Sequence, residues 1–279
     1  MRSPVPNSSS RKGLEAETRE RLEMLHRNTT GPFGVEEAGR VLGVDRVRAR
    51  RLVAHLAAKG WLVRIRRGLY ATVPLGAVEP ADWREDAWTV AVRSFAPCYI
   101  AGWSACEHWG LTEQIFRDIA VVTAQPVRKS AVTIQGTAFR LRHRAEEMLF
   151  GTRIVWRDRV QVPVSDPSRT VVDVLDAPQL GAGIRHVADV LNDYFAGEHR
   201  DDRLLLDYAA RVNNGTVYKR LGYLVESLGI DVPHVVETCR TSLSAGLTFL
   251  DPAVHRPGRI SKRWNLRVNV EIRRGGEPS

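Results

Sequence analysis

A strongly uneven charge distribution is the feature of this sequence that most restricts what the chain can fold into and bind. The chain of 279 residues has a formal net charge of +9. Residues 1–75 contain 15 Arg and Lys against 7 Asp and Glu, so nearly all of the surplus lies in this segment. Charge concentrated in one segment indicates a surface for a polyanion.

Apolar spacing in the same segment predicts three helices. The first is expected over residues 14–26 and the second over residues 35–42, with Gly43 in the turn that follows. Asp45 is a good N-cap for a third helix that runs to about residue 59 and buries a single apolar stripe. The third helix therefore presents its other face, rich in arginine, to solvent.

A hairpin is expected directly after the third helix. Gly60 ends that helix, and two short strands, residues 62–65 and 69–71, flank a turn in which Gly68 can adopt a positive φ. Three helices followed by such a hairpin predict a winged helix-turn-helix over residues 14–75. Residues 1–13 contain few apolar residues, and we expect a flexible basic arm there.

The third helix would lie in the major groove of DNA, with its outward N-terminal side chains at the base edges. Those positions are Arg46, Val47, Arg50 and Arg51. Basic residues expected nearer the phosphates or the minor groove are Lys59, Arg64, Arg66 and Arg67. The predicted partner is double-stranded operator DNA with inverted repeats. The alternative is a protein-docking module whose arginines serve solubility.

The remainder, residues 76–279, predicts a larger mixed α+β domain, so the fold class is α+β with a small sheet and a helical C-terminal half. A boundary is expected at residues 75–82, where Pro and Gly gather. Expected strands or extended runs are 99–103, 119–124, 131–142, 152–156, 160–164 and a final 265–272. Expected helices are 83–95, 105–109, 168–175 after Asp166-Pro167, 183–195, 202–212, 216–228 and 232–243.

Composition excludes several other classes. Cys98, Cys106 and Cys239 are odd in number and lack metal-ligand spacing, which predicts buried reduced thiols and no disulfide or zinc site. No run approaches the ~18 apolar residues of a membrane helix, and residues 1–13 lack the apolar core of a signal peptide. We therefore expect a cytoplasmic protein without membrane contact. The sequence shows no catalytic motif, and no cofactor or metal is expected.

Four segments together carry a resemblance to a known family: Gly60-Trp61-Leu62-Val63-Arg64-Ile65-Arg66-Arg67-Gly68-Leu69-Tyr70, Ser104-Ala105 with Trp109-Gly110-Leu111-Thr112, Asp166-Pro167-Ser168-Arg169-Thr170, and Lys219-Arg220-Leu221-Gly222-Tyr223-Leu224-Val225-Glu226. In this order they resemble the AbiEi antitoxins of AbiE-type, type IV toxin-antitoxin systems. The chain departs from the family pattern at Trp109, where His is common, with His108 just before it.

The resemblance implies that the chain is encoded beside a nucleotidyltransferase-like toxin. It implies that the N-terminal domain represses this operon and that the second domain, residues 76–279, neutralises the toxin. Antitoxin and toxin of type IV systems need not form a complex, so direct contact is left open.

A second basic surplus lies in residues 117–169, which hold ten basic and five acidic residues. We expect a basic face there that carries the antitoxin activity by contacting RNA, the toxin or operator DNA. Its residues are Arg128, Lys129, Arg140, Arg142, Arg144, Arg153, Arg157 and Arg159. The alternative is a sheet edge protected by charge. The tryptophans at 83, 88, 103, 109 and 156 are expected to pack in the core rather than to stack on bases.

Two other functions remain as alternatives. A ligand-responsive repressor would hold an effector pocket in the second domain. A metal-dependent nuclease would use Glu271-Ile272-Arg273 on the last strand, which resembles a Glu-x-Lys metal-site strand. Arg replaces the Lys and does not readily give up a proton, and no paired Asp is evident, which disfavours the nuclease.

Overall fold

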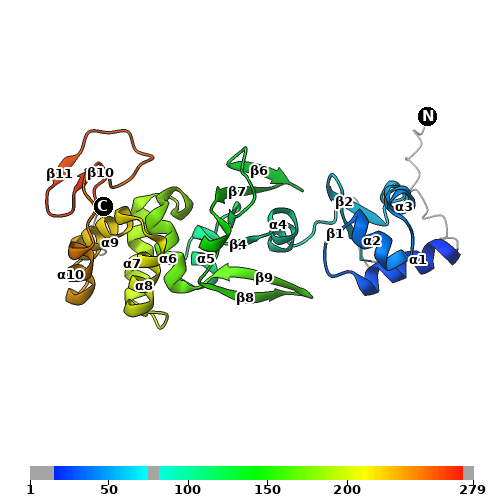
Figure 1. Cartoon of the computed structure of the whole chain (residues 1–279), viewed down its shortest axis with the longest axis horizontal. Coiled ribbons are helices and arrows are strands. Elements are labelled where there is room, and N and C mark those ends of the chain that lie inside the picture. Colours follow the sequence, from blue (N-terminus) through cyan, green and yellow to red (C-terminus); the bar gives the residue numbers. More distant parts are fainter. Residues whose placement is uncertain (1–15, 75–81, 273–279) are drawn as a thin grey trace, which may run out of the picture. The chain divides into compact units, whose positions relative to one another are not determined.

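The computed structural model describes residues 16–74 and 82–272, and the chain divides into two compact units, Met1–Glu85 and Asp86–Ser279 (Figure 1). We call them the head and the second unit. The predicted basic arm, residues 1–13, and nearly all of the predicted linker, residues 75–82, lie outside the described residues. Within the described part, every helix is too short or too polar to cross a membrane.

The head has the element order of a winged helix-turn-helix, as predicted. Its elements are α1 (Ala16–Asn28), β1 (Phe33–Gly34), α2 (Val35–Leu42), α3 (Arg46–Ala58), β2 (Leu62–Arg66) and β3 (Leu69–Thr72). The strands form one antiparallel sheet in the order β1-β3-β2. The two-residue strand β1 was not predicted, because its pairing with β3 leaves no periodic signal in so short a segment.

Close approach of α2 and α3 fixes the angle at which α3 is presented. A Cβ at Gly39 of α2 would lie 3.4 Å from Cβ of Ala49 on α3 and 3.0 Å from the carbonyl oxygen of Val44, and Gly43 turns the chain with φ of 64°. Leu25 of α1, Phe33 of β1 and Val53 of α3 are fully buried in the core of the head. Burial of such side chains stabilises the head by about 1.5–3 kcal/mol each, so α3 rests on a well-packed core.

The second unit combines a sheet with a helical C-terminal half, again as predicted (Figure 1). Its helices are α4 (Ala87–Phe95), α5 (Gly102–His108), η1 (Glu146–Met148), α6 (Pro167–Asp176), η2 (Pro178–Gly181), α7 (Ile184–Ala196), α8 (Asp202–Val212), α9 (Gly215–Leu228) and α10 (Pro233–Thr241). Its strands are β4 (Cys98–Ile100), β5 (Ile119–Thr123), β6 (Ala131–Ile134), β7 (Thr137–His143), β8 (Thr152–Arg157), β9 (Val160–Ser165), β10 (Thr248–Phe249), β11 (Arg259–Ser261) and β12 (Leu266–Val268).

The main sheet has six strands in the order β6-β7-β5-β4-β9-β8. The antiparallel hairpins β6–β7 and β8–β9 form its two ends, and β5·β7 and β4·β9 are parallel pairs. Helix α6 leaves β9 at Asp166, whose side chain accepts a 2.9 Å hydrogen bond from the backbone N–H of Arg169. Residues 167–175 of α6 are buried, so this helix joins the sheet to the C-terminal helices.

Three predicted elements were wrong in extent. Residues 131–142 form two strands, because Gln135 and Gly136 turn the chain with φ of 49° and 83°, and the alternation simply continues on the returning strand. Residues 99–103 do not stay extended, since Gly102 begins α5. The predicted last strand, residues 265–272, shrinks to β12, although Val270 remains buried. Burial therefore continues beyond β12 without strand pairing.

Helix α4 also begins later than predicted. Asp86 accepts a 2.8 Å hydrogen bond from the backbone N–H of Thr89 and caps the helix, so residues 83–86 precede it. Strands β10 and β11 were not predicted. Each pairs with β12 and is two or three residues long. Strands this short form only because they pair with β12, and they are too short to show a periodic pattern in the sequence.

The three cysteines are buried and unpaired, which confirms the prediction of free thiols. Burial raises the pKa of the Cys98 and Cys239 thiols to about 12 and raises that of Cys106 as well. A thiol with so high a pKa stays protonated and inert near neutral pH.

Candidate nucleic-acid interface

The N-terminus of α3 is fixed by its cap. The carboxylate of Asp45 accepts hydrogen bonds from the backbone N–H groups of Val47 at 2.9 Å and Arg48 at 3.0 Å, which confirms the predicted N-cap. These bonds, the one from Arg48 first, hold the pKa of Asp45 below its ordinary value of 3.8. The first turn of α3 is therefore ordered where its side chains face solvent.

Side chains from α3 and from the hairpin meet at one groove of about 670 Å³. Four residues predicted separately from the helix and the wing line it: Arg46, Arg50, Arg64 and Arg67. The turn between β2 and β3 holds Gly68 at φ of 80°, which confirms the predicted hairpin glycine. The structure thus combines the predicted base-facing and backbone-facing residues into one positively charged surface.

Most of these cations have no internal partner. Among the described residues, Arg50, Arg51 and the wing residue Arg64 form no ion pair or hydrogen bond through their side chains, and the same holds for Lys59 and Arg67. Arg46 lies 3.6 Å from Glu36, but its side chain stays 79% exposed. Exposed pairs of this kind contribute little to stability, so Arg46 is available to a ligand.

Two further residues of α3 complete the surface. Val47 is 61% exposed, so its apolar side chain faces solvent between the arginines of α3. Sequence reasoning missed Arg48, whose side chain is 76% exposed and lies 3.8 Å from Asp45. The sequence feature that could have identified Arg48 is its position in the first turn of α3, close to the N-cap residue Asp45.

Comparison with known families identifies the head. Residues 20–73 match the family model described as a transcriptional regulator, AbiEi antitoxin. The head belongs to the AbiEi antitoxin family. The matched residues run from α1 through the wing of this AbiEi domain and include none of the second unit. No curated protein matches the chain.

Outside the AbiEi domain, the second basic set falls into two groups. Arg140, Arg142 and Arg144 belong to β7 or follow it, and Arg128 and Lys129 precede β6 as exposed residues. Arg140 donates a 2.9 Å hydrogen bond to Asp118, and Arg142 and Arg144 both bind the carboxylate of Asp176. Arg140, Arg142 and Arg144 therefore each pair with a carboxylate of the second unit.

The other group lies at β8, on the opposite end of the sheet. The guanidinium of Arg153 lies 5.5 Å from the ring of Trp109, that of Arg157 lies 4.4 Å from the ring of Trp88, and Arg159 follows in the turn. Strands β5, β4 and β9 separate β7 from β8, a distance of about 20 Å at the usual strand spacing. The expectation of one continuous basic face was wrong, because the sheet order divides its residues.

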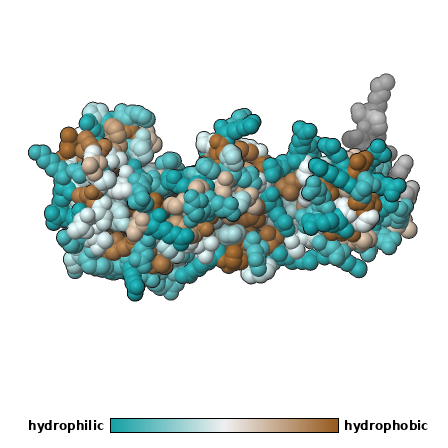
Figure 2. Space-filling view, in the orientation of Figure 1, coloured by the Kyte–Doolittle hydropathy of each residue, from teal (hydrophilic) through white to brown (hydrophobic). Residues whose placement is uncertain are grey.

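The tryptophans are mostly internal, as predicted, with one exception. Trp88 and Trp103 are buried and Trp83 and Trp109 are half-buried, but Trp156 is 61% exposed on β8. Ile154, two residues earlier on β8, is 51% exposed. Figure 2 shows hydrophobic surface over the β8–β9 part of the second unit. The expectation of core packing was wrong for Trp156, because β8 is an edge strand.

Of the residues proposed for a nuclease, the two that the structure describes, Glu271 and Ile272, do not lie on a strand. Glu271 follows β12, and its backbone oxygen lies 3.4 Å from Nε of Arg185, while Arg273 is outside the described residues. In residues 16–74 and 82–272, no three His, Cys, Asp or Glu side chains gather as metal ligands do. The described residues therefore do not provide the metal-site strand that the nuclease alternative requires.

Proposed function

We propose that this protein is a DNA-binding antitoxin that represses its own toxin-antitoxin operon through the AbiEi head. The observation that supports this most directly is the groove between α3 and the wing, which is lined by four exposed arginines. Of these four, only Arg46 forms an ion pair with an acidic residue among those that the structure describes. A surface of unpaired guanidinium groups favours phosphates and guanine edges. Operator DNA in the cytoplasm is the partner that fits this surface.

In this proposal α3 and the wing have different roles in DNA binding. Arg50 and Arg51, on the exposed face of α3, read base edges in the major groove. Val47 contacts a thymine methyl group, which suits an exposed aliphatic side chain at this place. Arg66 and Arg67 in the wing bind phosphates or the minor groove and hold the register without specifying sequence.

A gel-shift assay with the protein's own promoter fragment tests this proposal. We expect salt-sensitive retention of the promoter and weaker retention of a scrambled fragment of equal length. Arg50→Ala and Arg51→Ala should each weaken promoter binding by about 5- to 150-fold, the value of one bidentate base contact, and relax base preference. Arg66→Ala and Arg67→Ala should weaken both fragments alike.

The control for these variants is Arg203→Ala, which removes an exposed arginine from α8 in the second unit. It lowers the net charge by the same amount as each head variant. If the control weakens promoter binding as much as Arg50→Ala does, the groove is not the DNA-binding surface. The absence of any salt-sensitive promoter retention would remove the proposal altogether.

We further propose that the second unit neutralises a nucleotidyltransferase-like toxin encoded beside the antitoxin. The proposal is supported by the antitoxin family of the head and by the resemblance of segments in the second unit. Full-length Arg50→Ala/Arg51→Ala should lose repression of a promoter reporter but still restore growth to cells that express the toxin. If growth rescue and repression are lost together at equal protein level, neutralisation depends on DNA binding and not on the second unit alone.

A further inference from the structure

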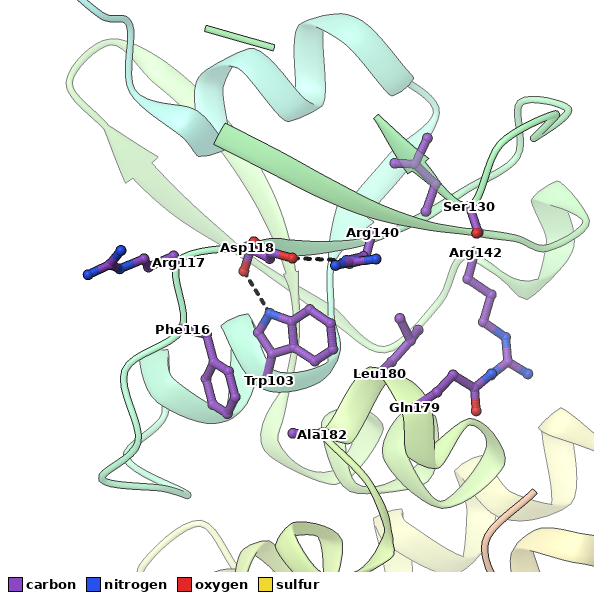
Figure 3. Close-up of a pocket in the computed structure, with 11 residues that line it drawn as sticks. Trp103, Phe116, Arg117, Asp118, Ser130, Arg140, Arg142, Gln179, Leu180 and Ala182 are labelled. Atoms are coloured by element: carbon purple, nitrogen blue, oxygen red, sulfur yellow. Dashed lines mark hydrogen bonds and ion pairs between the residues drawn. The ribbon is translucent and has the colours of Figure 1, made fainter. Parts of the chain in front are cut away.

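A pocket of about 510 Å³ lies in the second unit, between the β5–β7 part of the sheet and the segment that follows α6 (Figure 3). Small-molecule sites commonly occupy about 300–1,000 Å³, so the size suits a ligand of nucleotide dimensions. The lining comes from α5, the loop before β5, strand β7 and η2. None of the functions assigned to the head uses this pocket.

One part of the pocket is an aromatic wall. The rings of Trp103 and Phe116 stack with their centroids 5.6 Å apart and their planes 25° apart. The indole N–H of Trp103 donates a 2.7 Å hydrogen bond to the backbone oxygen of Asp118, which fixes the orientation of the ring. Leu180 of η2 adds apolar surface beside it. Because these aromatic side chains are already held in place, a planar ring can stack against them with little loss of side-chain conformational entropy.

The other part of the pocket is basic. Arg140 and Arg142 project from alternate positions of β7 toward the space above η2, with Gln179 beside Arg142 (Figure 3). Arg140 is paired with Asp118 and remains 49% exposed. Arg117 also belongs to the lining but points away from the other two arginines (Figure 3).

Positive charge exceeds negative charge around Arg142. Arg142 and Arg144 share the single carboxylate of Asp176, and that carboxylate also accepts a 2.6 Å hydrogen bond from Asn214. Burial lowers the pKa of Arg142, and the neighbouring charge of Arg144 lowers it further, although Asp176 opposes this. An anion in the pocket would supply the charge that Asp176 alone cannot, and a guanidinium matches a phosphate through two parallel hydrogen bonds.

We propose that this pocket binds a nucleoside phosphate, with the base against Trp103 and Phe116 and the phosphate on Arg140 and Arg142. The aromatic wall and the arginines lie in one cavity, so a ligand must offer a planar ring and an anion together. Such a site would be the effector pocket that the ligand-responsive alternative requires in the second unit. It does not depend on what the head binds.

Isothermal titration of the full-length protein tests the proposal. The probes are the four ribonucleoside monophosphates and triphosphates, the matching nucleosides and inorganic phosphate. We expect at least one nucleotide to bind with a Kd below about 1 mM, and nucleoside or phosphate alone to bind at least about tenfold more weakly. Phosphate binding as tightly as every nucleotide would overturn the assignment of a nucleotide.

Variants that are expected to weaken nucleotide binding, and one that is expected to tighten it, distinguish binding in this pocket from a general effect of net charge. Arg140→Ala should weaken nucleotide binding by at least about tenfold, the scale of one charged hydrogen bond, and should fold because both side chains of its pair with Asp118 are partly exposed. Gln179→Glu should also weaken binding, because it places a carboxylate beside Arg142. Asp118→Asn should tighten binding, because it releases Arg140 while keeping the backbone oxygen that orients Trp103.

The matched control is Arg203→Ala on α8, which removes one exposed arginine away from the pocket. It should leave the Kd unchanged within about twofold. The proposal is overturned if no nucleotide binds. It is equally overturned if the control weakens binding as much as Arg140→Ala does, or if Asp118→Asn weakens it.

Discussion

Arg169 donates a 3.0 Å hydrogen bond from Nε to Oδ1 of Asp173, one turn later in α6, and both side chains are almost fully buried. The hydroxyl of Tyr99 on β4 joins them, since it donates to Asp173 at 2.9 Å and accepts from Arg169 at 3.0 Å. The ring of Phe150 lies 4.1 Å from the guanidinium. This buried pair therefore ties the sheet to α6 and, through α6, to the C-terminal helices.

Removing the cation of this pair should strongly destabilise the second unit. Arg169→Ala removes the cation that Asp173 contacts and leaves its carboxylate buried, and breaking such a pair costs about 3–5 kcal/mol. Urea denaturation followed by circular dichroism measures the change in unfolding free energy. Arg169→Met/Asp173→Leu, which removes both charges, should recover most of the loss. An unchanged midpoint for Arg169→Ala would contradict the structural role of the pair.

Charge reversal on β7 should unfold the protein rather than reveal a binding face. Arg142→Glu/Arg144→Glu places two carboxylates against Asp176, whose side chain is 4% exposed. We expect a loss of about 3–5 kcal/mol of unfolding free energy in urea, because a buried carboxylate loses both of its arginine partners.

The matched variant Arg128→Glu/Lys129→Glu changes the same number of charges at exposed positions. It should stay within about 0.5 kcal/mol of the parent in the same urea titration. Loss of toxin rescue by this second variant would assign the antitoxin contact to the segment before β6. Full rescue would exclude that segment. Equal stability of the two double variants would show that Asp176 does not need its arginines.

The groove of the head predicts a change in the salt dependence of DNA binding. Arg64→Ala and Arg67→Ala should each reduce the slope of log K against log salt concentration by about one, because each removes one phosphate contact. Val47→Ala should leave the slope unchanged and weaken binding only at sites with a contacted thymine. Filter binding at several salt concentrations measures both effects. A reduced slope for Val47→Ala would mean that this variant perturbs the helix itself.

Gly222 in α9 is required by Trp264. A Cβ built at Gly222 would overlap the indole ring of Trp264, which is 1% exposed and donates a 2.7 Å hydrogen bond to Glu226. Gly222→Ala gains about 1 kcal/mol of helix propensity but costs about 1–3 kcal/mol in overpacking, so we expect net destabilisation in thermal melts. Adding Trp264→Leu should make Gly222→Ala less harmful. Additive effects of the two changes would argue against the contact.

The cap of α3 predicts a pH effect in the head. Because its folded pKa is lowered, the Asp45 carboxylate stabilises the head fully above pH 3.8, and this contribution is lost as the pH falls through the folded pKa. Asp45→Asn keeps a capping oxygen that does not titrate. The difference in melting temperature between the parent and this variant should shrink or reverse as the pH drops from 5 toward 3. A difference independent of pH would contradict the cap.

Much of the head could be predicted from the sequence because its determinants are local. The cap at Asp45, the apolar stripe of α3 and the glycine at position 68 each act within a few residues, and the structure confirms all three. The second unit was predicted less well at its turns and last strands. Apolar residues occur on both sides of the turn at Gln135 and continue beyond β12, so periodicity alone could not mark where pairing begins or ends.

The sequence by itself determined that positive charge gathers on a helix and hairpin near the N-terminus, since charge and local periodicity are both written along the chain. Only the tertiary structure decided which arginines are available to a partner. Arg142 meets Asp176 across 34 positions and Arg140 meets Asp118 across 22, so cations that looked equivalent to those of α3 form ion pairs within the second unit. Ion pairing depends on distance in space, and residues far apart in sequence come together only when the sheet and helices pack.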